Sequence, residues 1–404
     1  MKRDVLIIGG GPSGAAAAIV AARGGLNVTL FEKGPYGRDK ICGDGLTPRA
    51  IAALNKLNID HSSAHRIDGL RMIAGKRERE LLWPSTTRFP NHGAVWPRGR
   101  FDSHLIDVAI CSGADVRFGA EALPYIENNR CSGVIVNGEK FTSPLTVLAT
   151  GAQGQAASIL GAVRDTREPY GLAIRAYAHT SRHAERYLEA CLSLCDENGT
   201  AIAGYGWVFP AGDGTVNVGV GALSTMKGFT TLNLNKLLSQ YSTSIRDLWD
   251  LGKFVEKPRA WRLPMSCIKR HGLGWAAVGD AAGFVNPMNG EGIDYGLESG
   301  VLVIEKFFEN PETAPFVYDA EIGERFDGFL RTGRRFSFLI GHPWLLKPGL
   351  RVAVGTQQAA EVTLAVMGNL IDSSTPGLNG KVMRAADASL RALDPLLRLS
   401  RRKV

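Results

Sequence analysis

A glycine-rich turn close to the start of the chain has residue types and a spacing that can hold a dinucleotide. The sequence GGGPSG at residues 9–14 follows the pattern G-x-G-x-x-G. In this pattern Gly9 permits the tight turn, Gly11 lets the backbone approach a pyrophosphate, and Gly14 lets the following helix pack on the strand. Glu32 follows Gly14 by 18 residues, a position from which a carboxylate binds a pair of ribose hydroxyls. Since an acidic residue here fits an unphosphorylated ribose, we expect FAD or NAD rather than NADP.

A second group of residues, near position 280, could hold the other end of such a cofactor. Asp280 follows a short apolar run and can accept a hydrogen bond from a sugar-like hydroxyl, such as one on the ribityl chain of FAD. Downstream, the sequence NPMNGEGI at residues 286–293 brings Gly290 and Gly292 ahead of a helix predicted from about residue 294. The N-terminus of that helix would favour negative charge on a bound flavin. A capped helix after an ordinary turn is the structural alternative.

Three aromatic residues and one cysteine could form the reacting part of the site. Tyr205, Trp207 and Phe209 alternate along a predicted strand, so their side chains share one face. That face could line an apolar slot containing one phenol hydroxyl, although the same pattern also suits the core aromatics of a sheet. Cys42 lies on a glycine-rich loop. Because a thiol with a pKa near ~8.5 is a weak acid, we expect it to position or gate a substrate rather than to protonate it.

The elements that must position these residues begin with a strand, a helix and a strand. Residues 5–8 form a continuous apolar run, as expected for a parallel strand that is buried on both faces. Residues 12–23 are rich in alanine and favour a helix, and residues 27–31 return as a strand, which together predict a βαβ opening. Farther on, a helix is predicted over 47–57 with Thr47 as its N-cap.

The middle of the chain is richer in strands, and its end is richer in helices. Strands are predicted at 171–177, 205–209 and 216–220, and a short strand at 275–278 leads into Asp280. The last residues of the chain are mainly helical by their apolar periodicity.

The composition excludes several classes of protein. The 404 residues are 45% hydrophobic and 21% charged, which is enough apolar material for a core and excludes intrinsic disorder. The net charge of +8 favours an anionic partner such as a lipid surface or a polyanionic cofactor, but no recognition motif for nucleic acid is present. The histidines and cysteines show no metal-ligand spacing, so no metal is expected. Apolar stretches are too short for a spanning helix, and residues 1–4 lead directly into a strand without a secretory signal, so we expect a cytoplasmic protein.

Together, these motifs resemble the flavin hydroxylase superfamily, whose Rossmann-type fold is like that of glutathione reductase. The similarity rests on the G-x-G-x-x-G opening, an R-x-x-F-D element, a Gly-Asp element and an N-P-x-x-G-E-G-I loop. The sequence RGRFD at 98–102 supplies the second of these, so the resemblance implies that Arg98 contacts FAD. Hydroxylases also carry Asp-Gly after the strand near position 149, where this chain has Ala149-Thr150-Gly151. That departure argues against direct use of NADPH.

Two further segments resemble the geranylgeranyl reductase family within this superfamily. The sequence DKICGDGL at 39–46 is similar to the family's cysteine loop, and GYGWVFP at 204–210 is similar to its substrate-domain signature. Within the family, CGDGLTPRA at 42–50 and NGEGIDYGLE at 289–298 look most like the actinobacterial menaquinone β-isoprene reductases. The resemblance implies an α/β fold, in which an FAD-binding Rossmann-type domain carries an inserted β-rich substrate domain and a C-terminal helical segment.

The FAD-binding domain is expected to be discontinuous along the chain. The expected bounds are 1–65, 95–165 and 265–330 for the FAD-binding domain, 66–94 and 166–264 for the substrate domain, and 331–404 for the C-terminal helical segment.

The resemblance also implies an activity, namely an FAD-dependent reductase that saturates an isolated C=C bond in a polyprenyl chain such as the isoprenoid tail of menaquinone. The electron donor is left open. An unactivated alkene accepts a hydride poorly, so its positioning against the flavin must carry much of the rate. The residues expected to act on the substrate are Cys42, Tyr205 and Trp207. The residues expected to bind FAD are Gly9, Gly11, Pro12, Ser13, Gly14, Ala15, Glu32, Lys33, Cys42, Gly43, Asp44, Gly45, Arg98, Asp280, Gly290, Gly292 and Ile293.

Other activities remain open at this point. A geranylgeranyl diphosphate or phospholipid reductase would need the same chemistry. A flavin-dependent monooxygenase or halogenase is a second alternative, because halogenases carry a similar G-W-x-W-x-I-P segment, although Tyr205 and Phe209 side with the reductases. A flavoprotein that binds FAD without catalysis is a third, and the substrate-domain signature argues against it.

A polyprenyl substrate resides in the bilayer, so we expect the protein to work at the membrane surface, peripheral to the inner face of the cell membrane. Residues 381–403 carry seven basic residues and two acidic ones, with apolar residues at helical spacing. A basic amphipathic helix of this kind can lie in the lipid interface. Pro395 would interrupt the helix, and a helix packed on the body of the protein with a solvated basic face is the alternative.

Overall fold

The computed structural model describes residues 1–86, 88–152 and 154–371, together with residues 381, 385, 388–390 and 392. The predicted basic helix over 381–403 therefore lies for the most part outside the described residues.

A six-stranded sheet forms the core of the first part of the molecule. Its order is β18-β19-β12-β1-β2-β8. Its strands are β1 (Val5–Ile8), β2 (Val28–Glu32), β8 (Asp115–Phe118), β12 (Leu145–Leu148), β18 (His271–Gly272) and β19 (Trp275–Ala277). All pairs are parallel except β18 with β19. All four residues of β1 are buried, as expected for a central parallel strand that is covered on both faces. The predicted βαβ opening is confirmed.

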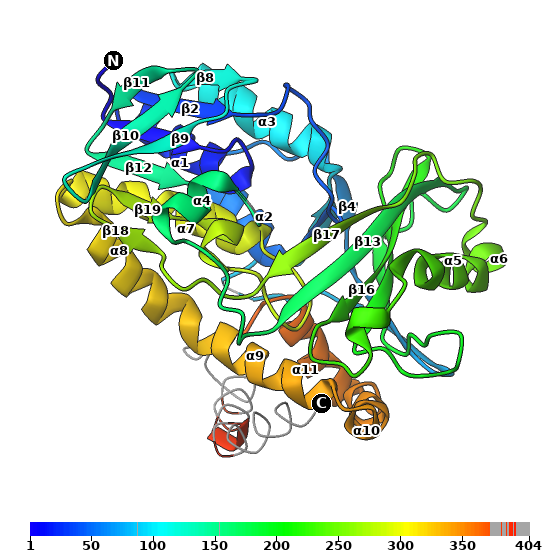
Figure 1. Cartoon of the computed structure of the whole chain (residues 1–404). Coiled ribbons are helices and arrows are strands. Elements are labelled where there is room, and N and C mark those ends of the chain that lie inside the picture. The colour runs from blue at the N-terminus through cyan, green and yellow to red at the C-terminus, as the bar shows by residue number, and fades with distance from the viewer. Residues whose placement is uncertain are drawn as a thin grey trace.

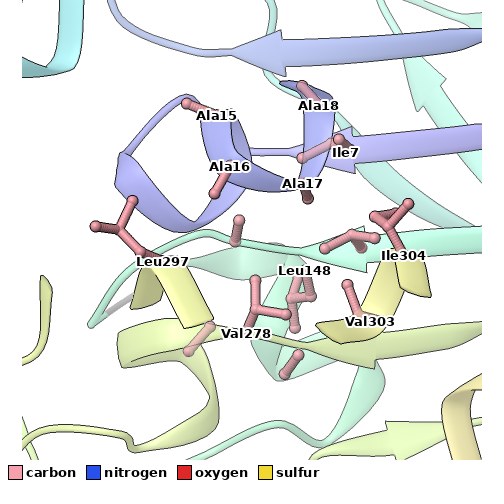
Figure 2. Close-up of a cluster of buried hydrophobic side chains, with 14 of the residues drawn as sticks. Ile7, Ala15, Ala16, Ala17, Ala18, Leu148, Val278, Leu297, Val303 and Ile304 are labelled. Atoms are coloured by element: carbon pink, nitrogen blue, oxygen red, sulfur yellow. The ribbon is translucent and has the colours of Figure 1, made fainter. Parts of the chain in front are cut away.

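Small residues let two helices pack closely against each other on this sheet. Helix α1 (Pro12–Arg23) and helix α7 (Ile293–Glu309) lie side by side, and Figure 2 shows the alanines of α1 facing side chains of α7 and of the strands. A Cβ atom on Gly300 would lie 2.2 Å from the carbonyl oxygen of Ser13, so the helices could not approach this closely with any larger residue at that position. Helix α3 (Arg98–Cys111) also packs on α1.

A seven-stranded sheet forms the second large unit. Its order is β17-β13-β16-β15-β14-β5-β6. Its strands are β5 (Gly69–Ala74), β6 (Arg77–Leu82), β13 (Tyr170–His179), β14 (Tyr187–Cys191), β15 (Gly204–Pro210), β16 (Thr215–Leu223) and β17 (Arg259–Pro264). The strands predicted at 171–177, 205–209 and 216–220 are confirmed and are longer than expected. Helices α5 (Leu234–Ser244) and α6 (Arg246–Trp249) lie along this sheet on the side away from α1 (Figure 1).

Smaller elements accompany the two large sheets. One three-stranded sheet contains β9 (Leu123–Glu127), β10 (Arg130–Val136) and β11 (Glu139–Thr142), and another contains β3 (Gly45–Leu46), β4 (His65–Ile67) and β7 (Gly93–Val95). Helix α2 (Pro48–Lys56) follows β3, and helix α4 (Gln155–Leu160) follows β12.

Helices dominate the end of the described chain. They are α8 (Ala314–Ile322), α9 (Gly328–Ile340), α10 (Pro343–Ala353) and α11 (Gln357–Met367), with a π-helical turn (Gly323–Asp327) between α8 and α9. Figure 1 shows α8 and α9 running beneath both large sheets, with α10 and α11 at the end of this run. In the described part of the chain, none of the helices has the length and apolarity needed to cross a membrane.

The two large sheets draw their strands from different parts of the chain. The six-stranded sheet uses residues between 5 and 32, 115 and 148, and 271 and 277, whereas the seven-stranded sheet uses residues between 69 and 82 and between 170 and 264. On the basis of this pattern, we propose that the chain divides into an FAD-binding domain and a substrate domain with the bounds given above.

Candidate functional site

A cavity of about 1030 Å³ lies where the two large sheets meet the C-terminal helices. One part of its wall comes from the carboxyl ends of β1, β2 and β12, with Ile8, Glu32 and Ala149, which is where open α/β sheets bind ligands. A second part comes from β13, β15, β16 and β17, and a third from α9, α10 and α11.

The glycine-rich turn leaves one end of this cavity open. Gly9 has a φ of +110°, and a Cβ atom there would lie 2.3 Å from the carbonyl oxygen of Ala149, so only glycine fits. A Cβ atom on Gly11 would meet nothing closer than 3.9 Å, and the nearest atoms are guanidinium nitrogens of Arg38 and Arg98. The N-terminus of α1 therefore faces open space beside two cations, and the residues present fit the pyrophosphate of FAD.

Glu32 lies buried at the end of β2 and holds the surrounding loop together. Its Oε2 accepts hydrogen bonds from the Gly10 N–H at 2.8 Å and from Arg38 at 2.9 Å, and its Oε1 accepts one from the Gly34 N–H at 2.7 Å. Burial raises the pKa of Glu32, but Arg38 and the two N–H groups more than offset this, so that its pKa lies below the ordinary value. The ionised carboxylate lines the cavity, where its free lone pairs could accept ribose hydroxyls.

Replacing Glu32 with alanine is expected to weaken FAD binding by ~1.5–3 kcal/mol, because a hydrogen bond to a charged group is lost. Titration of the apoprotein with FAD, followed by flavin fluorescence, measures this. Glu139→Ala removes an exposed carboxylate of β11 and should leave the affinity unchanged. Equal FAD affinities for Glu32→Ala and the wild type would show that Glu32 does not contact the ribose.

Arg98 begins α3, and its charge is already paired within that helix. Its guanidinium donates to both carboxylate oxygens of Asp102, at 2.7 and 2.8 Å, and its backbone N–H donates to Asp44 at 3.3 Å. Because Arg98 is buried and also lines the cavity, it presents a fixed cationic surface to a bound cofactor.

The loop that precedes α7 forms the opposite part of the cofactor end. Asp280, Gly290, Gly292 and Ile293 all line the cavity. Helix α7 begins at Ile293, and its N-cap residue supplies no side-chain cap. The Tyr295 N–H donates to Asp294 Oδ1 at 2.7 Å, so the N–H groups of Ile293 and Asp294 are the ones that can meet a bound flavin.

Thr47 does not cap α2 in the way that the sequence predicts. It occupies the N-cap position but makes no capping hydrogen bond, and its hydroxyl instead donates to Glu291 Oε1 at 2.7 Å. The predicted N-cap position of Thr47 is confirmed, but the capping hydrogen bond is not made, because a buried carboxyl group from the loop before α7 accepts the hydroxyl. Burial also raises the pKa of Glu291.

Four residues of the predicted FAD-binding set lie behind the cavity wall. Gly14 serves helix packing, because a Cβ atom there would lie 2.0 Å from the carbonyl oxygen of Gly9, and Ala15 is fully buried. Gly45 faces the ring of Phe209, and Asp44 is engaged by other side chains (below).

The remaining predicted residues do line the cavity, and their contact with FAD stays a prediction. They are Gly9, Gly11, Pro12, Ser13, Glu32, Lys33, Cys42, Gly43, Arg98, Asp280, Gly290, Gly292 and Ile293.

The three aromatic residues of β15 form one wall of the cavity, as their alternation predicts. The ring of Trp207 lies 5.9 Å from that of Tyr205 and 6.2 Å from that of Phe209, measured between centroids. Trp207 lies against Gly219 of the neighbouring strand β16, where a Cβ atom would come within 2.1 Å of its Cζ2. The Tyr205 hydroxyl donates to the backbone carbonyl of Asn289 at 2.5 Å, which ties this wall to the loop before α7.

Asn217 joins the aromatic wall to the cysteine loop. Its Oδ1 accepts the Trp207 indole N–H at 2.9 Å, while its Nδ2 donates to the backbone carbonyl of Cys42 at 2.8 Å and to Asp44 Oδ2 at 2.7 Å. Asp44 Oδ2 also accepts the Tyr177 hydroxyl at 2.5 Å. Asn217 is fully buried, and a satisfied buried network of this kind fixes the geometry of its members.

Asp44 makes folding stability depend on pH. Burial raises its pKa to about 6, despite hydrogen bonds from Tyr177 and Asn217 that act in the opposite direction. Since the folded state holds this proton more tightly than the unfolded state, the contribution is favourable below the ordinary pKa near 3.8 and is lost as pH rises through about 6.

We therefore expect the wild type to lose stability relative to Asp44→Asn between about pH 4 and pH 7, by roughly 3 kcal/mol. The measurement is urea unfolding of both proteins across this range. Comparing the two at each pH removes the constant cost of the amide. A difference that does not change with pH, or that changes in the other direction, would contradict the assignment.

Two groups at the reacting end stay protonated near neutral pH. Burial raises the pKa of the Cys42 thiol, although Arg98 acts in the opposite direction, and burial likewise raises the pKa of the Tyr205 phenol. Both side chains line the cavity, so each can hold a proton there, at Sγ and at Oη.

Sequence reasoning missed several parts of the wall. Lys40 lines the cavity, its Nζ lies 4.3 Å from the ring centroid of Trp261, and burial lowers its pKa. The role of Asn217 could have been recognised, because the sequence VNVGVG at 216–221 places an asparagine and two glycines on one face of a strand. The apolar wall from α9, α10 and α11 was also missed.

Comparison with known proteins agrees with this geometry. A family model described as FAD dependent oxidoreductase matches residues 4–67. The menaquinone reductase of Mycolicibacterium smegmatis is 34% identical, over 97% of this chain and 98% of that protein. The digeranylgeranylglycerophospholipid reductase of Picrophilus torridus is 29% identical, over 75% of this chain and 77% of that protein.

Solved structures share the fold. A geranylgeranyl bacteriochlorophyll reductase-like protein from Thermoplasma acidophilum superposes with a TM-score of 0.76 at 24% identity, over 91% of this chain and 98% of that chain. The flavin-dependent brominase Bmp2 superposes with a TM-score of 0.73 at 16% identity, over 97% of this chain and 100% of that chain. Given the relatives that align over nearly its whole length, this chain belongs to the geranylgeranyl reductase family of FAD-dependent oxidoreductases, in the branch of the menaquinone reductases.

Proposed function

We propose that this protein saturates an isolated C=C bond in the isoprenoid tail of menaquinone. The observation that carries the proposal is the cavity itself, in which the surface that fits FAD is continuous with an apolar wall. That wall includes Leu263 and Met265 at the end of β17 and continues along α9–α11 with Leu339, Leu346 and Val366. A flexible hydrocarbon chain is the ligand class that such a wall suits, because its binding depends on apolar contact rather than on directed hydrogen bonds.

The chain's own residues position the alkene and hold a proton. FAD, when bound, supplies the electron pair for the reduction. The aromatic wall of Tyr205, Trp207 and Phe209 excludes water and presses the alkene toward the cofactor, and Asn217 keeps the Cys42 loop beside it. The protonated Tyr205 phenol and Cys42 thiol face the same space. Neither is a strong acid, so accurate placement of the alkene must carry much of the rate.

An anaerobic assay tests the function. The purified holoenzyme would be reduced with dithionite, which replaces the physiological electron donor, and mixed in detergent micelles with menaquinone or with a geranylgeranyl phospholipid. We expect menaquinone to gain two hydrogens in its isoprenoid tail, located by the masses of tail fragments, because the quinone ring can itself accept two electrons from reduced flavin or dithionite.

Three outcomes would replace the proposal. Turnover of the geranylgeranyl phospholipid alone would assign the protein to lipid saturation. A reaction that needs oxygen would indicate a monooxygenase or halogenase. If neither lipid reoxidises the flavin without oxygen, the protein is not a prenyl reductase.

We further propose that the protein works at the membrane surface, peripheral to the inner face of the cell membrane. Two properties support this: a long isoprenoid substrate stays in the bilayer, and the net charge of +8 favours an anionic surface.

A further inference from the structure

Helix α10 carries an apolar stripe that the described part of the molecule leaves uncovered. Trp344 and Val352 are each 71% exposed, which makes them the most exposed large apolar side chains among the described residues. They lie eight residues apart with the exposed Pro348 between them, so the three share one face of the helix. The outward face of a helix on a soluble protein is normally polar.

The buried face of the same helix shows that α10 is fixed in place. Leu346 and Val354 are buried against the body of the protein. Two arginines of the edge strand β6 bind the carbonyl groups at its C-terminus. Arg77 donates to the carbonyl of Arg351 at 3.3 Å, and Arg79 donates to that of Val354 at 2.8 Å. The apolar stripe is therefore held outward by contacts on the opposite side.

This stripe also forms a rim of the cavity. Pro348, Gly349 and Val352 are exposed and line the cavity at the same time. On the neighbouring helix α9, Phe336 does the same and is 37% exposed. The cavity thus reaches the surface between α9 and α10, and the residues at its mouth are apolar.

The charged residues of α9 and α10 are of one sign. From residue 328 to residue 360 the sequence contains five basic residues and no acidic residue. Arg334 pairs with Glu168, whereas Arg331 and Arg351 are exposed. An exposed tryptophan beside basic residues is the pattern of a surface that rests in a lipid headgroup layer, where the ring sits at the interface and the cations meet anionic lipid.

We propose that α10 and the end of α9 dock on an anionic lipid bilayer, so that the mouth of the cavity opens directly into the membrane. The proposal rests on the proposed function in one respect, namely that the ligand entering through this mouth is a membrane lipid. It differs from the prediction that residues 381–403 supply the membrane contact.

Flotation with vesicles tests the docking surface on the whole holoenzyme. The vesicles are phosphatidylcholine alone or phosphatidylcholine mixed with phosphatidylglycerol. We expect Trp344→Ser/Arg351→Gln to lower binding to the anionic vesicles at least about tenfold. The matched control Ile268→Ser/Arg325→Gln removes one exposed apolar side chain, 64% exposed, and one exposed arginine, neither of which belongs to α9 or α10, and it should bind as the wild type does.

Tryptophan fluorescence locates the contact independently of affinity. Brominated lipids quench tryptophans that enter the bilayer, so the wild type should be quenched on anionic vesicles and Trp344→Phe should lose most of that quenching. Equal quenching of the two proteins would overturn the proposal. So would unchanged flotation of Trp344→Ser/Arg351→Gln.

Two other occupants of the stripe give different results. If the basic tail is the true membrane contact, a variant with its last basic residues replaced will lose flotation while the α10 variant keeps it; the replacements are Arg398→Gln, Arg401→Gln, Arg402→Gln and Lys403→Gln. If a second copy of the chain covers α10, the wild type will be dimeric without lipid and Trp344→Ser will be monomeric. Either result would overturn the proposal.

Activity measurements separate this proposal from the proposed function. Trp344 does not line the cavity, so Trp344→Ser should reduce menaquinone in detergent micelles as fast as the wild type and should slow only with menaquinone in vesicles. If the wild type reduces no prenyl lipid in micelles, the proposed function fails, and flotation still decides the docking surface.

Discussion

Replacing Trp207 with alanine is expected to lower the rate of prenyl-chain reduction about 100-fold, the scale of loss that follows from misplacing a reacting group by ~1 Å. The change removes the ring that lies on Gly219 and leaves the Asn217 Oδ1 atom without its buried donor. Asn217 would then hold the Cys42 loop less firmly. FAD affinity should change little, because Trp207 belongs to β15 and not to the strands that meet the glycine-rich turn.

The reaction is followed without oxygen as the gain of two hydrogens in the isoprenoid tail of menaquinone, measured by mass spectrometry, because the quinone ring can itself reoxidise reduced flavin. Trp207→Phe is the control, because it keeps an aromatic ring on this wall while it removes the N–H donor and the outer part of the indole, and it should retain more activity than Trp207→Ala. A folded Trp207→Ala protein that has lost its flavin would mean that Trp207 belongs to the cofactor contact surface and that the proposed domain division is wrong.

Replacing Arg49 should cause the largest loss in the free energy of unfolding. Its guanidinium donates to both carboxylate oxygens of Glu298, at 2.7 and 3.0 Å, and lies 3.9 Å from Asp294 and 4.9 Å from the ring centroid of Tyr295. Arg49 is buried. Arg49→Met would leave two carboxylates without their cation in a poorly solvated place, so we expect a loss of ~3–5 kcal/mol in the free energy of unfolding.

Urea unfolding measures this loss, and a second ion pair provides the control. Arg66 pairs with Asp68 at 3.1 Å, but its side chain is 47% exposed, so Arg66→Met should cost less than ~1 kcal/mol. Similar losses for the two variants would show that the cluster around Arg49 is solvated in the folded protein. Because Arg49 joins α2 to α7, its loss should also weaken FAD binding through the loop before α7.

The six-stranded sheet could be predicted because its strands carry their own signal. Residues 5–8 are apolar without interruption, and a glycine-rich turn follows them. This combination is typical of the first strand of a dinucleotide-binding sheet. The parallel pairing of β14 with β5 had no such signal, since it joins residues more than a hundred positions apart. The N-cap position of Thr47 could be predicted, but the partner of its hydroxyl could not, because that partner is a distant carboxyl group that only the folded chain brings near.

Parts of the site could be predicted where the type and spacing of the residues point to a single role. Glycines that approach a phosphate, an acid after the second strand and alternating aromatics all follow from local rules. The wall from α9 to α11 could not be predicted, because apolar periodicity shows which face of a helix avoids water but not what covers that face. The outward stripe of α10 shows the limit of such a rule, since its apolar residues face away from the core.

The central place of β1 has a consequence for how the protein is made. In the sheet, β1 lies between β2, the next strand along the chain, and β12. The other neighbour of β12 is β19, which ends at Ala277. Ribosomes add roughly 5–20 residues per second, so β1 exists for roughly 15–50 s before β19 is complete. Helices α9 to α11 emerge later still, so the residues at the cofactor end of the cavity are all synthesised before the apolar wall that these helices supply. Until those helices are synthesised, the apolar cavity wall on β13 and β15 is exposed to solvent. The supply of flavin and of chaperones during synthesis, more than the stability of any one helix, should therefore set the yield of active enzyme.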